Sequence, residues 1–379
     1  MTPNSDPIPE LFQQALEQIT HSHYQAARCL PADFYVSNQW LEFELEHLFR
    51  KQWICVGRME ELRHRGDYLT ITIANEPVLV CRSNDGRLRA FSNVCRHRGT
   101  TVMEGSGNAD RFICPYHHWT YDTFGELVSA PLMRSQKHFN LKKCNLQEVR
   151  CEQWMGFVFV NLDSGAKSLK PGLQPARDLV KNYHVESMYL KYVSTETWGT
   201  NWKSLMENYM EGYHLSPLHK TTLHKLNPTR LCEPIPPGDN HFGYRVGFSQ
   251  RLPADQRGHR DLNPEEMSSC VMLALPPSLG IGIGSDYSSF VCLYPMSTAE
   301  VTIKTGLVFH GRQWSESEID EAVGLFELTM AEDRQVLRRV HAGLQSNYHQ
   351  AGPLAPRDYE GTIWDFYQYL ARQLLPVLS

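Results

Sequence analysis

The chain of 379 residues is long enough for two or three domains. Its 41% hydrophobic and 21% charged residues exclude a mainly disordered chain, and a net charge of -5 gives no reason to expect a nucleic-acid partner. No apolar run reaches the roughly 18 residues that a membrane span needs, and the N-terminus lacks the pattern of a secretory signal. We therefore expect a cytoplasmic protein without a membrane or nucleic-acid partner, whose ten cysteines are reduced thiols or metal ligands.

The first 50 residues carry the apolar spacing of helices. Phe12, Leu16 and Ile19 recur at helical intervals, and so do Leu41, Leu45 and Leu48 in a stretch rich in glutamate. The pattern predicts an N-terminal helical segment over residues 1–50, which we expect to pack on the larger of the domains that follow.

The pattern of apolar and turn-forming residues over 51–163 predicts a small β domain. Apolar residues alternate with threonine over residues 68–73, short apolar runs follow at 78–80 and 157–160, and Asn84-Asp85-Gly86 is a hairpin signal. Residues 164–175 contain Gly165 and Pro171-Gly172, which indicate a domain boundary.

Residues 164–379 mix helices and strands, which predicts an α+β domain. We expect a helix over residues 201–213, strands over 271–275, 290–294 and 301–310, and two long C-terminal helices over 316–344 and 363–378. The polar stretch 253–266 is interpreted as a surface loop or lid. The run Gly280-Ile281-Gly282-Ile283-Gly284 resembles a nucleotide-binding loop, but no helix signal follows it, so a strand is the better interpretation.

Two Cys/His pairs form the first candidate metal site. Cys95 and His97 precede one turn signal, and Cys114 and His117 flank another at Pro115, so two hairpin tips could present two thiolates and two imidazoles to one place. One zinc ion could take all four ligands. A Rieske [2Fe–2S] cluster fits the tight Cys-x-His spacing better, because the cysteines then hold one iron and the histidines the other.

The residues around these pairs favour the cluster. His97-Arg98-Gly99 and the run from Cys114 through Asp122 to Gly125 resemble the cluster segment of ring-hydroxylating-type Rieske oxygenases. The sequence departs from that segment at His118, where many members have glycine. We interpret His118 as a residue beside the cluster or at the surface, and Trp119 and Tyr121 as packing and hydrogen-bonding residues around the sulfurs.

A second candidate metal site follows Asn201-Trp202-Lys203. Glu211 and His214 are three residues apart and would share a face of the predicted helix. His214 and His219 would point about 140° apart on a continuous helix. Pro217 lies between them and is expected to end the helix, so that His219 can fold back toward His214. Two converging histidines suit a mononuclear iron.

The third ligand of such an iron is predicted on the helix at 316–344. An apolar stripe runs through Ile319, Val323, Phe326, Met330, Leu337 and Val340. Asp333 falls within this stripe, whereas Glu332 is turned about 100° away from it. A buried carboxylate needs a cation, which is either an Arg or Lys partner or a metal that completes a 2-His-1-carboxylate triad.

From about Trp40 to its end, the chain resembles the catalytic α subunit of Rieske non-haem iron oxygenases. The resemblance includes the cluster motif, Asn201-Trp202-Lys203, the segment from Glu207 to His219, and Glu332-Asp333. It implies a small all-β Rieske domain plus a helix-grip-like catalytic domain with an antiparallel sheet and long C-terminal helices. It also implies that His214, His219 and Asp333 bind the mononuclear Fe(II).

The resemblance extends to assembly and to a subgroup. It implies that Glu211 bridges to the cluster of a neighbouring subunit in a head-to-tail homotrimer. Many aromatic-ring dioxygenases have Asp at this position, whereas Glu occurs in the relatives that act on carnitine and betaine-type quaternary amines. Gly212 departs from the Cys expected in those relatives.

The implied reaction is reductive activation of O2, with electrons from a separate NAD(P)H-dependent flavin or iron–sulfur reductase, or from a ferredoxin. We expect cleavage or demethylation of a quaternary ammonium compound; hydroxylation or dihydroxylation of an aromatic acid is the alternative. A Rieske electron carrier without oxygenase activity is a third hypothesis, but it would have no use for the second metal site. The aromatic and polar residues expected to approach the iron and line a substrate pocket are Trp202, Asn208, Tyr209, Tyr213, Tyr287 and Phe290.

Overall fold

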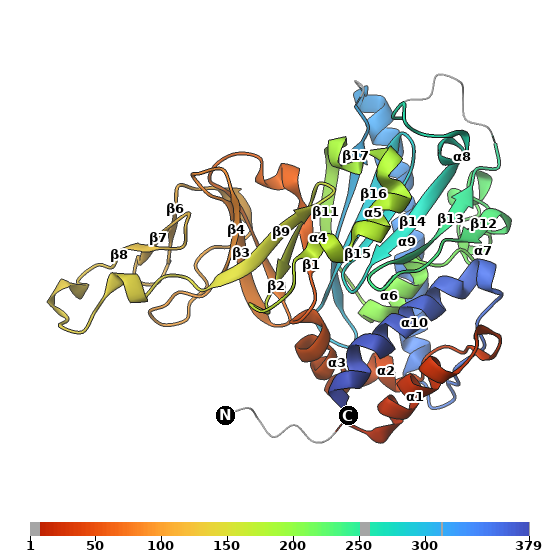
Figure 1. The fold of residues 1–379 in the computed structure, drawn as a ribbon, viewed down its shortest axis with the longest axis horizontal. Helices are drawn as coiled ribbons and strands as arrows, with labels where there is room; N and C mark the ends of the chain where they lie inside the picture. Colours follow the sequence, from red (N-terminus) through yellow and green to blue (C-terminus); the bar gives the residue numbers. More distant parts are fainter. Residues whose placement is uncertain (1–7, 251–257, 312–313, 379) are drawn as a thin grey trace. The chain divides into compact units, whose positions relative to one another are not determined.

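The computed structural model describes residues 8–250, 258–311 and 314–378 of the chain. These residues fall into two compact units (Figure 1). One unit is Phe49–Leu169, and the other combines Met1–Leu48 with Lys170–Ser379. The first unit compares with the small β domain expected at residues 51–163. The N-terminal helices belong to the same unit as the C-terminal half of the chain.

The smaller unit is built from two antiparallel sheets. The larger sheet has seven strands in the order β1-β10-β9-β4-β3-β2-β5, and the smaller sheet has the order β6-β7-β8. The strands are β1 (Ile54–Arg58), β2 (Asp67–Ile73), β3 (Glu76–Arg82), β4 (Leu88–Ser92), β5 (Ser106–Asn108), β6 (Arg111–Ile113), β7 (Thr120–Asp122), β8 (Leu127–Ser129), β9 (Glu148–Trp154) and β10 (Phe157–Asn161).

Apolar β-branched and aromatic residues favour the strand conformation here, and their side chains are buried. The whole of β10 is buried, and so are Val78 to Cys81 in the middle of β3. The predicted turn at residues 84–86 joins β3 to β4, and Gly86 takes the left-handed φ of 84° that such a turn needs. A cluster of buried residues that includes Cys95 and Cys114 joins the small sheet to the large one.

The larger unit contains a second seven-stranded antiparallel sheet in the order β11-β17-β16-β15-β14-β13-β12. Its strands are β11 (Tyr189–Trp198), β12 (Cys232–Pro234), β13 (Phe242–Gly247), β14 (Ser269–Leu275), β15 (Leu279–Ile283), β16 (Tyr287–Pro295) and β17 (Val301–Phe309). The glycine-rich run at 280–284 is therefore strand β15 and its end, as the sequence predicts.

Helices surround this sheet (Figure 1). They are α1 (Glu10–His21), α2 (Asp33–Val36), α3 (Asn38–Glu44), α4 (Leu169–Gly172), α5 (Gln174–Val180), α6 (Trp202–Tyr209), α7 (Leu215–Leu218), α8 (Pro264–Met267), α9 (Glu316–Leu344) and α10 (Arg357–Leu378). Helix α9 has the predicted bounds and begins at a capping box between Ser315 and Glu318. None of the helices in the described parts of the chain combines the length and apolar character that crossing a membrane requires.

Three local expectations differ from the structure. The predicted boundary at 164–175 is partly helical, because α4 and α5 begin within it. In the polar stretch 253–266, residues 251–257 lie outside the described residues, and Pro264–Met267 form α8, whose Glu266 is buried and bonded to Asn182. On α9, Val340 is 42% exposed, because the buried face of the helix turns toward Leu337, His341 and Leu344.

A buried ion pair attaches the N-terminal helices to α6. The carboxylate of Glu44 accepts hydrogen bonds from the ammonium of Lys203 at 2.7 Å and from the indole N–H groups of Trp40 at 2.8 Å and Trp202 at 2.9 Å. Both charged side chains are fully buried. The side chain of Asn201 caps α6 by accepting from the backbone N–H of Lys203. The motif Asn201-Trp202-Lys203 therefore has a structural role at the start of α6.

Candidate functional site

The two Cys/His pairs lie in two loops that each close a hairpin. In the first loop, the N–H of Cys95 donates to Thr100 and the N–H of Gly99 donates back to Cys95. In the second, between β6 and β7, the N–H of Cys114 donates to the carbonyl of Trp119. Both segments are hairpin tips, as the sequence predicts.

The four side chains are arranged as a cysteine pair and a histidine pair. Cys95 and Cys114 are buried at 3% and 2% exposure, and their thiols are close enough to hydrogen-bond. His97 and His117 are exposed, with ring centroids 4.6 Å apart. Among the described residues, no three of these four bring their ligand atoms within 4.8 Å of one another. That spacing disfavours one zinc ion and suits a cluster with two irons, one held by sulfur and one by nitrogen.

Neighbouring groups support this arrangement. The hydroxyl of Tyr121 lies 3.4 Å from the sulfur of Cys95 and accepts the backbone N–H of Arg96. The indole of Trp119 stacks on the ring of His97, with centroids 4.8 Å apart. Burial raises the pKa of the Cys114 thiol, and nearby Cys95 adds to this effect. A cation is therefore needed to hold the sulfur of Cys114 as a thiolate.

His118 takes the backbone conformation that a glycine would supply. Its φ is 57°, in the left-handed region, and its N–H donates to the carbonyl of Cys114. Its side chain is exposed. Many Rieske segments have glycine at this position, and the positive φ is the physical reason.

The helix predicted over residues 201–213 ends early, and this corrects the expected geometry of Glu211. Helix α6 stops at Tyr209 and α7 begins at Leu215, so Glu211 and His214 lie in the connection between them rather than on one helix face. The carboxylate of Glu211 accepts the backbone N–H groups of Tyr213 and His214, which replace helical hydrogen bonds.

Pro217 also differs from its expected role. It lies inside the single turn of α7, which ends at Leu218, rather than ending the helix before it. A proline in the first turn of a helix gives up an N–H that has no partner there. His219 follows directly after this turn, and its ring turns back toward His214 as expected, with centroids 5.0 Å apart.

His214, His219 and Asp333 converge. Their ligand atoms all lie within 4.8 Å of one another. Nε2 of His219 is 3.3 Å from Oδ1 of Asp333, and Nε2 of His214 is 3.7 Å from the same oxygen. Nε2 of His219 is buried and has no hydrogen-bond partner among the described residues. A buried nitrogen aimed at a carboxylate without a hydrogen bond is the arrangement that a metal ion would complete.

Each histidine is held from its other nitrogen by a glutamate. Nδ1 of His214 bonds to Glu211, and Nδ1 of His219 bonds to Glu332 at 2.7 Å. Thr222 donates its hydroxyl to the same oxygen of Glu332. A carboxylate on Nδ1 keeps the proton on that nitrogen and leaves the lone pair of Nε2 for a metal. Burial alone would lower the pKa of His214, but the charge and hydrogen bond of Glu211 outweigh burial and raise it.

Sequence reasoning missed the contact of Glu332. It correctly put Asp333 on the buried face of α9, where the residue is 7% exposed, and it turned Glu332 away from that face. A chemical argument could have predicted this contact, because a metal-bound imidazole needs an acceptor for the N–H of its second nitrogen. Glu332 is the acid next to the predicted ligand Asp333.

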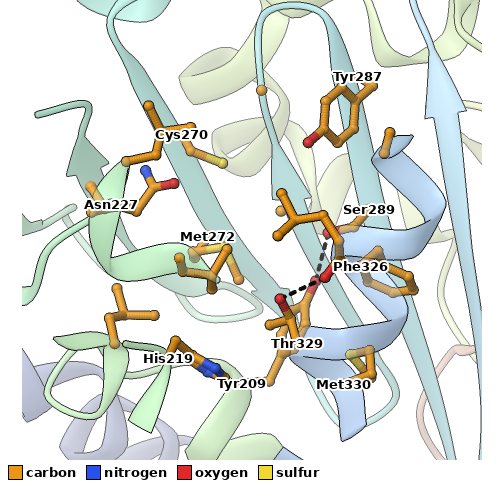
Figure 2. Close-up of a pocket in the computed structure, with 18 of the residues that line it drawn as sticks. Tyr209, His219, Asn227, Cys270, Met272, Tyr287, Ser289, Phe326, Thr329 and Met330 are labelled. Carbon is orange, nitrogen blue, oxygen red and sulfur yellow. Dashed lines mark hydrogen bonds between the residues drawn. The ribbon is translucent and has the colours of Figure 1, made fainter. Parts of the chain in front are cut away.

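A cavity of about 280 Å³ opens beside these three residues. Figure 2 shows lining side chains from the sheet, from helix α9 and from the segment that carries His219. Five aromatic rings line the cavity, those of Tyr209, Tyr244, Phe248, Tyr287 and Phe326. Asp286 adds a carboxylate that is separate from Asp333.

Three of the six residues expected in a pocket line this one, namely Asn208, Tyr209 and Tyr287. Trp202, Tyr213 and Phe290 do not. The indole of Trp202 is in the core, bonded to Glu44. Phe290 is fully buried and faces Gly306 on the neighbouring strand, and Tyr213 is 53% exposed. Successive side chains of β16 point to opposite faces of the sheet. Ser289 points into the pocket, so its neighbour Phe290 points away from it.

Two glycines of β15 make room for Tyr209. A Cβ at Gly280 would lie 2.6 Å from Cδ1 of Tyr209, and a Cβ at Gly282 would lie 2.8 Å from Oγ of Ser289. The phenol of Tyr209 can therefore lie against the strand, with its oxygen 3.2 Å from Oγ of Ser289 (Figure 2). The glycine pattern that resembled a nucleotide loop thus shapes the pocket wall.

Gly212 is also explained by its surroundings. A Cβ at this position would lie 2.3 Å from the sulfur of Cys232 on β12. The thiol of Cys232 fills the space that a larger residue 212 would occupy. The departure from the expected cysteine at 212 is therefore accompanied by a cysteine whose sulfur reaches the same place from another strand.

Family models match both units of the chain. The Rieske [2Fe-2S] domain matches residues 52–144, and the catalytic domain of the ring hydroxylating alpha subunit matches residues 180–375. The carnitine monooxygenase oxygenase subunit of Escherichia coli (strain K12) is 39% identical over 348 residues, covering 89% of this chain and 90% of that protein. The chain belongs to the Rieske ring-hydroxylating oxygenase family.

Further relatives agree with this assignment. The glycine betaine monooxygenase oxygenase subunit of Pseudomonas aeruginosa (strain UCBPP-PA14) is 26% identical over 388 residues, covering 91% of this chain and 89% of that protein. The fold is shared with a solved quaternary ammonium Rieske monooxygenase at a TM-score of 0.81 and 24% identity, with 97% of this chain and 99% of that chain covered. Naphthalene 1,2-dioxygenase from Rhodococcus sp. matches at a TM-score of 0.80 and 21% identity, covering 97% and 98%.

Membership of this family confirms the main predictions. The chain is the oxygenase subunit of a Rieske non-haem iron system, with a [2Fe–2S] domain and a catalytic domain of the type that uses a mononuclear iron. A Rieske electron carrier without oxygenase activity is excluded by the catalytic domain. As one subunit of a multi-component system, it works with a separate reductase and a small-molecule substrate.

Proposed function

We propose that this oxygenase oxidises a small quaternary ammonium compound. The observation that supports this proposal most directly is the cavity beside His214, His219 and Asp333, which is lined by five aromatic rings and by Asp286. Aromatic faces attract a trimethylammonium group by cation–π interaction, and a carboxylate adds charge attraction. The volume of about 280 Å³ is just below the usual range for ligand pockets, which suits a small molecule. The names of the carnitine and glycine betaine monooxygenase relatives agree with this substrate class.

We propose that His214, His219 and Asp333 hold the mononuclear iron. The buried Nε2 of His219 and the shared approach of both imidazoles to Oδ1 of Asp333 support these three as ligands. When bound in such a triad, iron supplies the reductive activation of O2. Glu211 and Glu332 keep the histidines in the tautomer and orientation that this requires.

We likewise propose Cys95, His97, Cys114 and His117 as the ligands of the [2Fe–2S] cluster. The buried sulfurs and exposed imidazoles support a cluster whose histidine side faces outward. A histidine at the surface is suited to exchange electrons with a partner, and Tyr121 beside Cys95 is placed to tune the sulfur. We infer that the electrons come from NAD(P)H through a flavin or iron–sulfur reductase or a ferredoxin, which is consistent with a cytoplasmic location.

The proposed chemistry is a monooxygenation. O2, two electrons and two protons convert a C–H bond next to the quaternary nitrogen into C–OH, and the second oxygen atom leaves as water. The hydroxyl then loses its proton as the C–N bond breaks: the carbon becomes an aldehyde, the amine leaves with the electron pair of that bond, and it takes up a proton. If the oxidised carbon is an N-methyl group, the aldehyde is formaldehyde.

We also propose that Glu211 links the two kinds of metal centre in a homotrimer. Its oxygens bond to His214 and to two backbone N–H groups, and a carboxylate has further lone pairs with which to meet a cluster histidine of a neighbouring subunit. A closed head-to-tail ring would satisfy each such contact with one repeated interface.

Oxygen uptake tests the substrate class. Purified enzyme with a reductase and NADH is given carnitine, γ-butyrobetaine, glycine betaine or an aromatic acid such as benzoate. We expect a quaternary amine to stimulate uptake and to yield one amine and one aldehyde per O2. Stimulation and hydroxylation only by the aromatic acid would overturn the proposal and favour aromatic oxygenation.

A pair of variants tests the aromatic cage. Tyr287→Phe keeps the ring and Tyr287→Leu removes it. We expect the Leu variant to raise the KM for the amine by about fivefold, which corresponds to the roughly 1 kcal/mol of a cation–π contact, while the Phe variant stays near wild type. Equal KM values in both would show that the ring face does not bind the cation.

A further inference from the structure

A second group of metal-binding side chains lies in the larger unit, apart from the three proposed iron ligands. It consists of His184, which follows the helical turn Lys181–Tyr183, and of His259 and Asp261, which precede α8. Within the described parts of the chain, this group and the group of His214 are the two in which three such residues bring their ligand atoms within 4.8 Å of one another.

The distances in this group suit a small divalent cation. Nε2 of His184 is 2.8 Å from Oδ2 of Asp261, and Nδ1 of His259 is 3.4 Å from the same oxygen. A tetrahedral ion with bonds of 2.0–2.1 Å holds its ligand atoms about 3.3 Å apart. The backbone N–H of Asp261 also lies 3.2 Å from Nδ1 of His259, at the long end for a hydrogen bond. Small side-chain movements would place an ion among the three ligands.

A third imidazole beside the group provides an independent observation. His310 follows β17 and is 9% exposed, and its ring centroid is 5.2 Å from that of His259. Its Nε2 is buried without a hydrogen-bond partner among the described residues. The rings of His184 and His259 are themselves only 3.8 Å apart. Contacts with Asp261 account for His184 and His259, and they leave the buried, unpartnered imidazole of His310 unexplained.

We propose that His184, His259 and Asp261 form a third metal site, distinct from both iron centres, that binds a divalent cation of the zinc class. Two imidazoles and one carboxylate are ligands typical of Zn²⁺, and either His310 or a water molecule completes the tetrahedron. Nothing in this site depends on the proposed substrate.

The site would tie a loop to the wall of the pocket. Gly258, at the start of this loop, packs so closely on Ser285 that a Cβ there would lie 3.0 Å from the Ser285 carbonyl oxygen. The N–H of His310 donates to the carbonyl of Asp286 at 2.9 Å. Ser285 and Asp286 both line the cavity. A cation that joins His184 to His259 and Asp261 would therefore hold this loop against Ser285 and Asp286, and with His310 as the fourth ligand it would also hold the loop to the end of β17.

Zinc uptake by the iron-loaded enzyme tests the proposal. Full-length protein with both iron centres occupied is dialysed against Zn²⁺ alone, and zinc and iron are counted per chain. We expect one zinc per chain, unchanged iron, and a higher thermal midpoint when zinc is present, because a ligand that binds only the native state stabilises it. His184→Gln and His259→Gln should each weaken zinc binding by about tenfold or more.

Control variants make the result decisive. Asp261→Asn changes an exposed ligand, so a folding defect is not expected, and it should also lose the zinc-dependent shift in thermal midpoint. His138→Gln changes an exposed histidine of the other unit and should behave as wild type. Zinc that displaces iron, or several weak zinc ions bound equally by wild type and His184→Gln, would overturn the proposal. Loss of binding in His310→Gln would identify the fourth ligand, and unchanged binding would assign that position to water.

Discussion

The wall formed by β15 and Tyr209 can be tested with a single methyl group. In Gly280→Ala, the new Cβ would lie 2.6 Å from Cδ1 and 2.7 Å from Cε1 of Tyr209. Carbon atoms in contact are normally 3.5–4.0 Å apart, so the ring must move by about 1 Å. Gly280 is not among the glycines with positive φ, so its backbone accommodates alanine and the clash is the only penalty.

The size of the effect follows from what the ring contacts. Overpacking of this kind costs about 1–3 kcal/mol. A shift of about 1 Å would also break the 3.2 Å hydrogen bond between Tyr209 and Ser289, worth about 1 kcal/mol. We therefore expect a loss of roughly 2–4 kcal/mol in the free energy of unfolding of the larger unit. Because Tyr209 lines the cavity, the KM for the substrate should rise as the ring moves inward.

Urea unfolding and oxygen-uptake kinetics measure the two consequences. Gly324→Ala is the matched control, since a Cβ there meets no atom within 4 Å and the residue lies inside α9. Alanine in a helix interior should stabilise by about 0.5–1 kcal/mol and leave the KM unchanged. Wild-type stability and KM in Gly280→Ala would refute the close packing of Tyr209 on β15.

Three further predictions concern buried and metal-facing carboxylates. Glu44→Ala leaves the buried ammonium of Lys203 without its acid and should cost about 3–5 kcal/mol in urea unfolding; a loss as small as that of an exposed Glu→Ala control would contradict this. Burial raises the pKa of Glu207 from 4.5 to about 7, so its favourable contribution is complete below pH 4.5 and is lost as the pH rises to 7. The stability of wild type relative to Glu207→Gln should thus fall by about 3 kcal/mol over that range, and parallel pH profiles would disprove the shift. Glu332→Gln should lower iron affinity, measured by chelator competition, by about 10–100-fold through His219 while leaving the EPR signal of the cluster intact; wild-type affinity would argue against a positioning role.

The long, periodic elements could be predicted from sequence because local patterns determine them. Helix α9 has a capping box at Ser315 and a strong apolar stripe, and its predicted bounds agree with the structure. In the Rieske unit, strand β2 alternates apolar residues with threonine, and the turn signal at residues 84–86 lies between β3 and β4. The hairpin tips with Cys95 and Cys114 could be predicted because each proposed Cys/His ligand pair lies within four neighbouring residues.

The connection from Met210 to His214 could not be predicted in the same way. Its residues have no helix breaker stronger than Gly212, and propensity favours continuing α6. The structure ends the helix through distant partners: the N–H of Gly212 donates to Tyr359, and the hydroxyl of Thr362 donates to Met210. Both partners lie on α10, about 150 residues later in the chain. Tertiary contacts of this kind override local propensity and leave no local signal.

Because α6 ends early, the position of Glu211 depends on specific hydrogen bonds rather than on helical spacing. On a continuous helix, Glu211 would share a face with His214 simply by spacing, and a solvated acid would do the same. In the connection, its carboxylate has replaced helical hydrogen bonds by accepting two backbone N–H groups, and it still reaches Nδ1 of His214. His219 is held by Glu332, which lies on α9, more than 100 residues later in the chain. The two imidazoles are thus oriented by independent carboxylates from different elements. A substitution of one glutamate should therefore leave the other histidine in place. Only the loss of both glutamates should misorient both histidines.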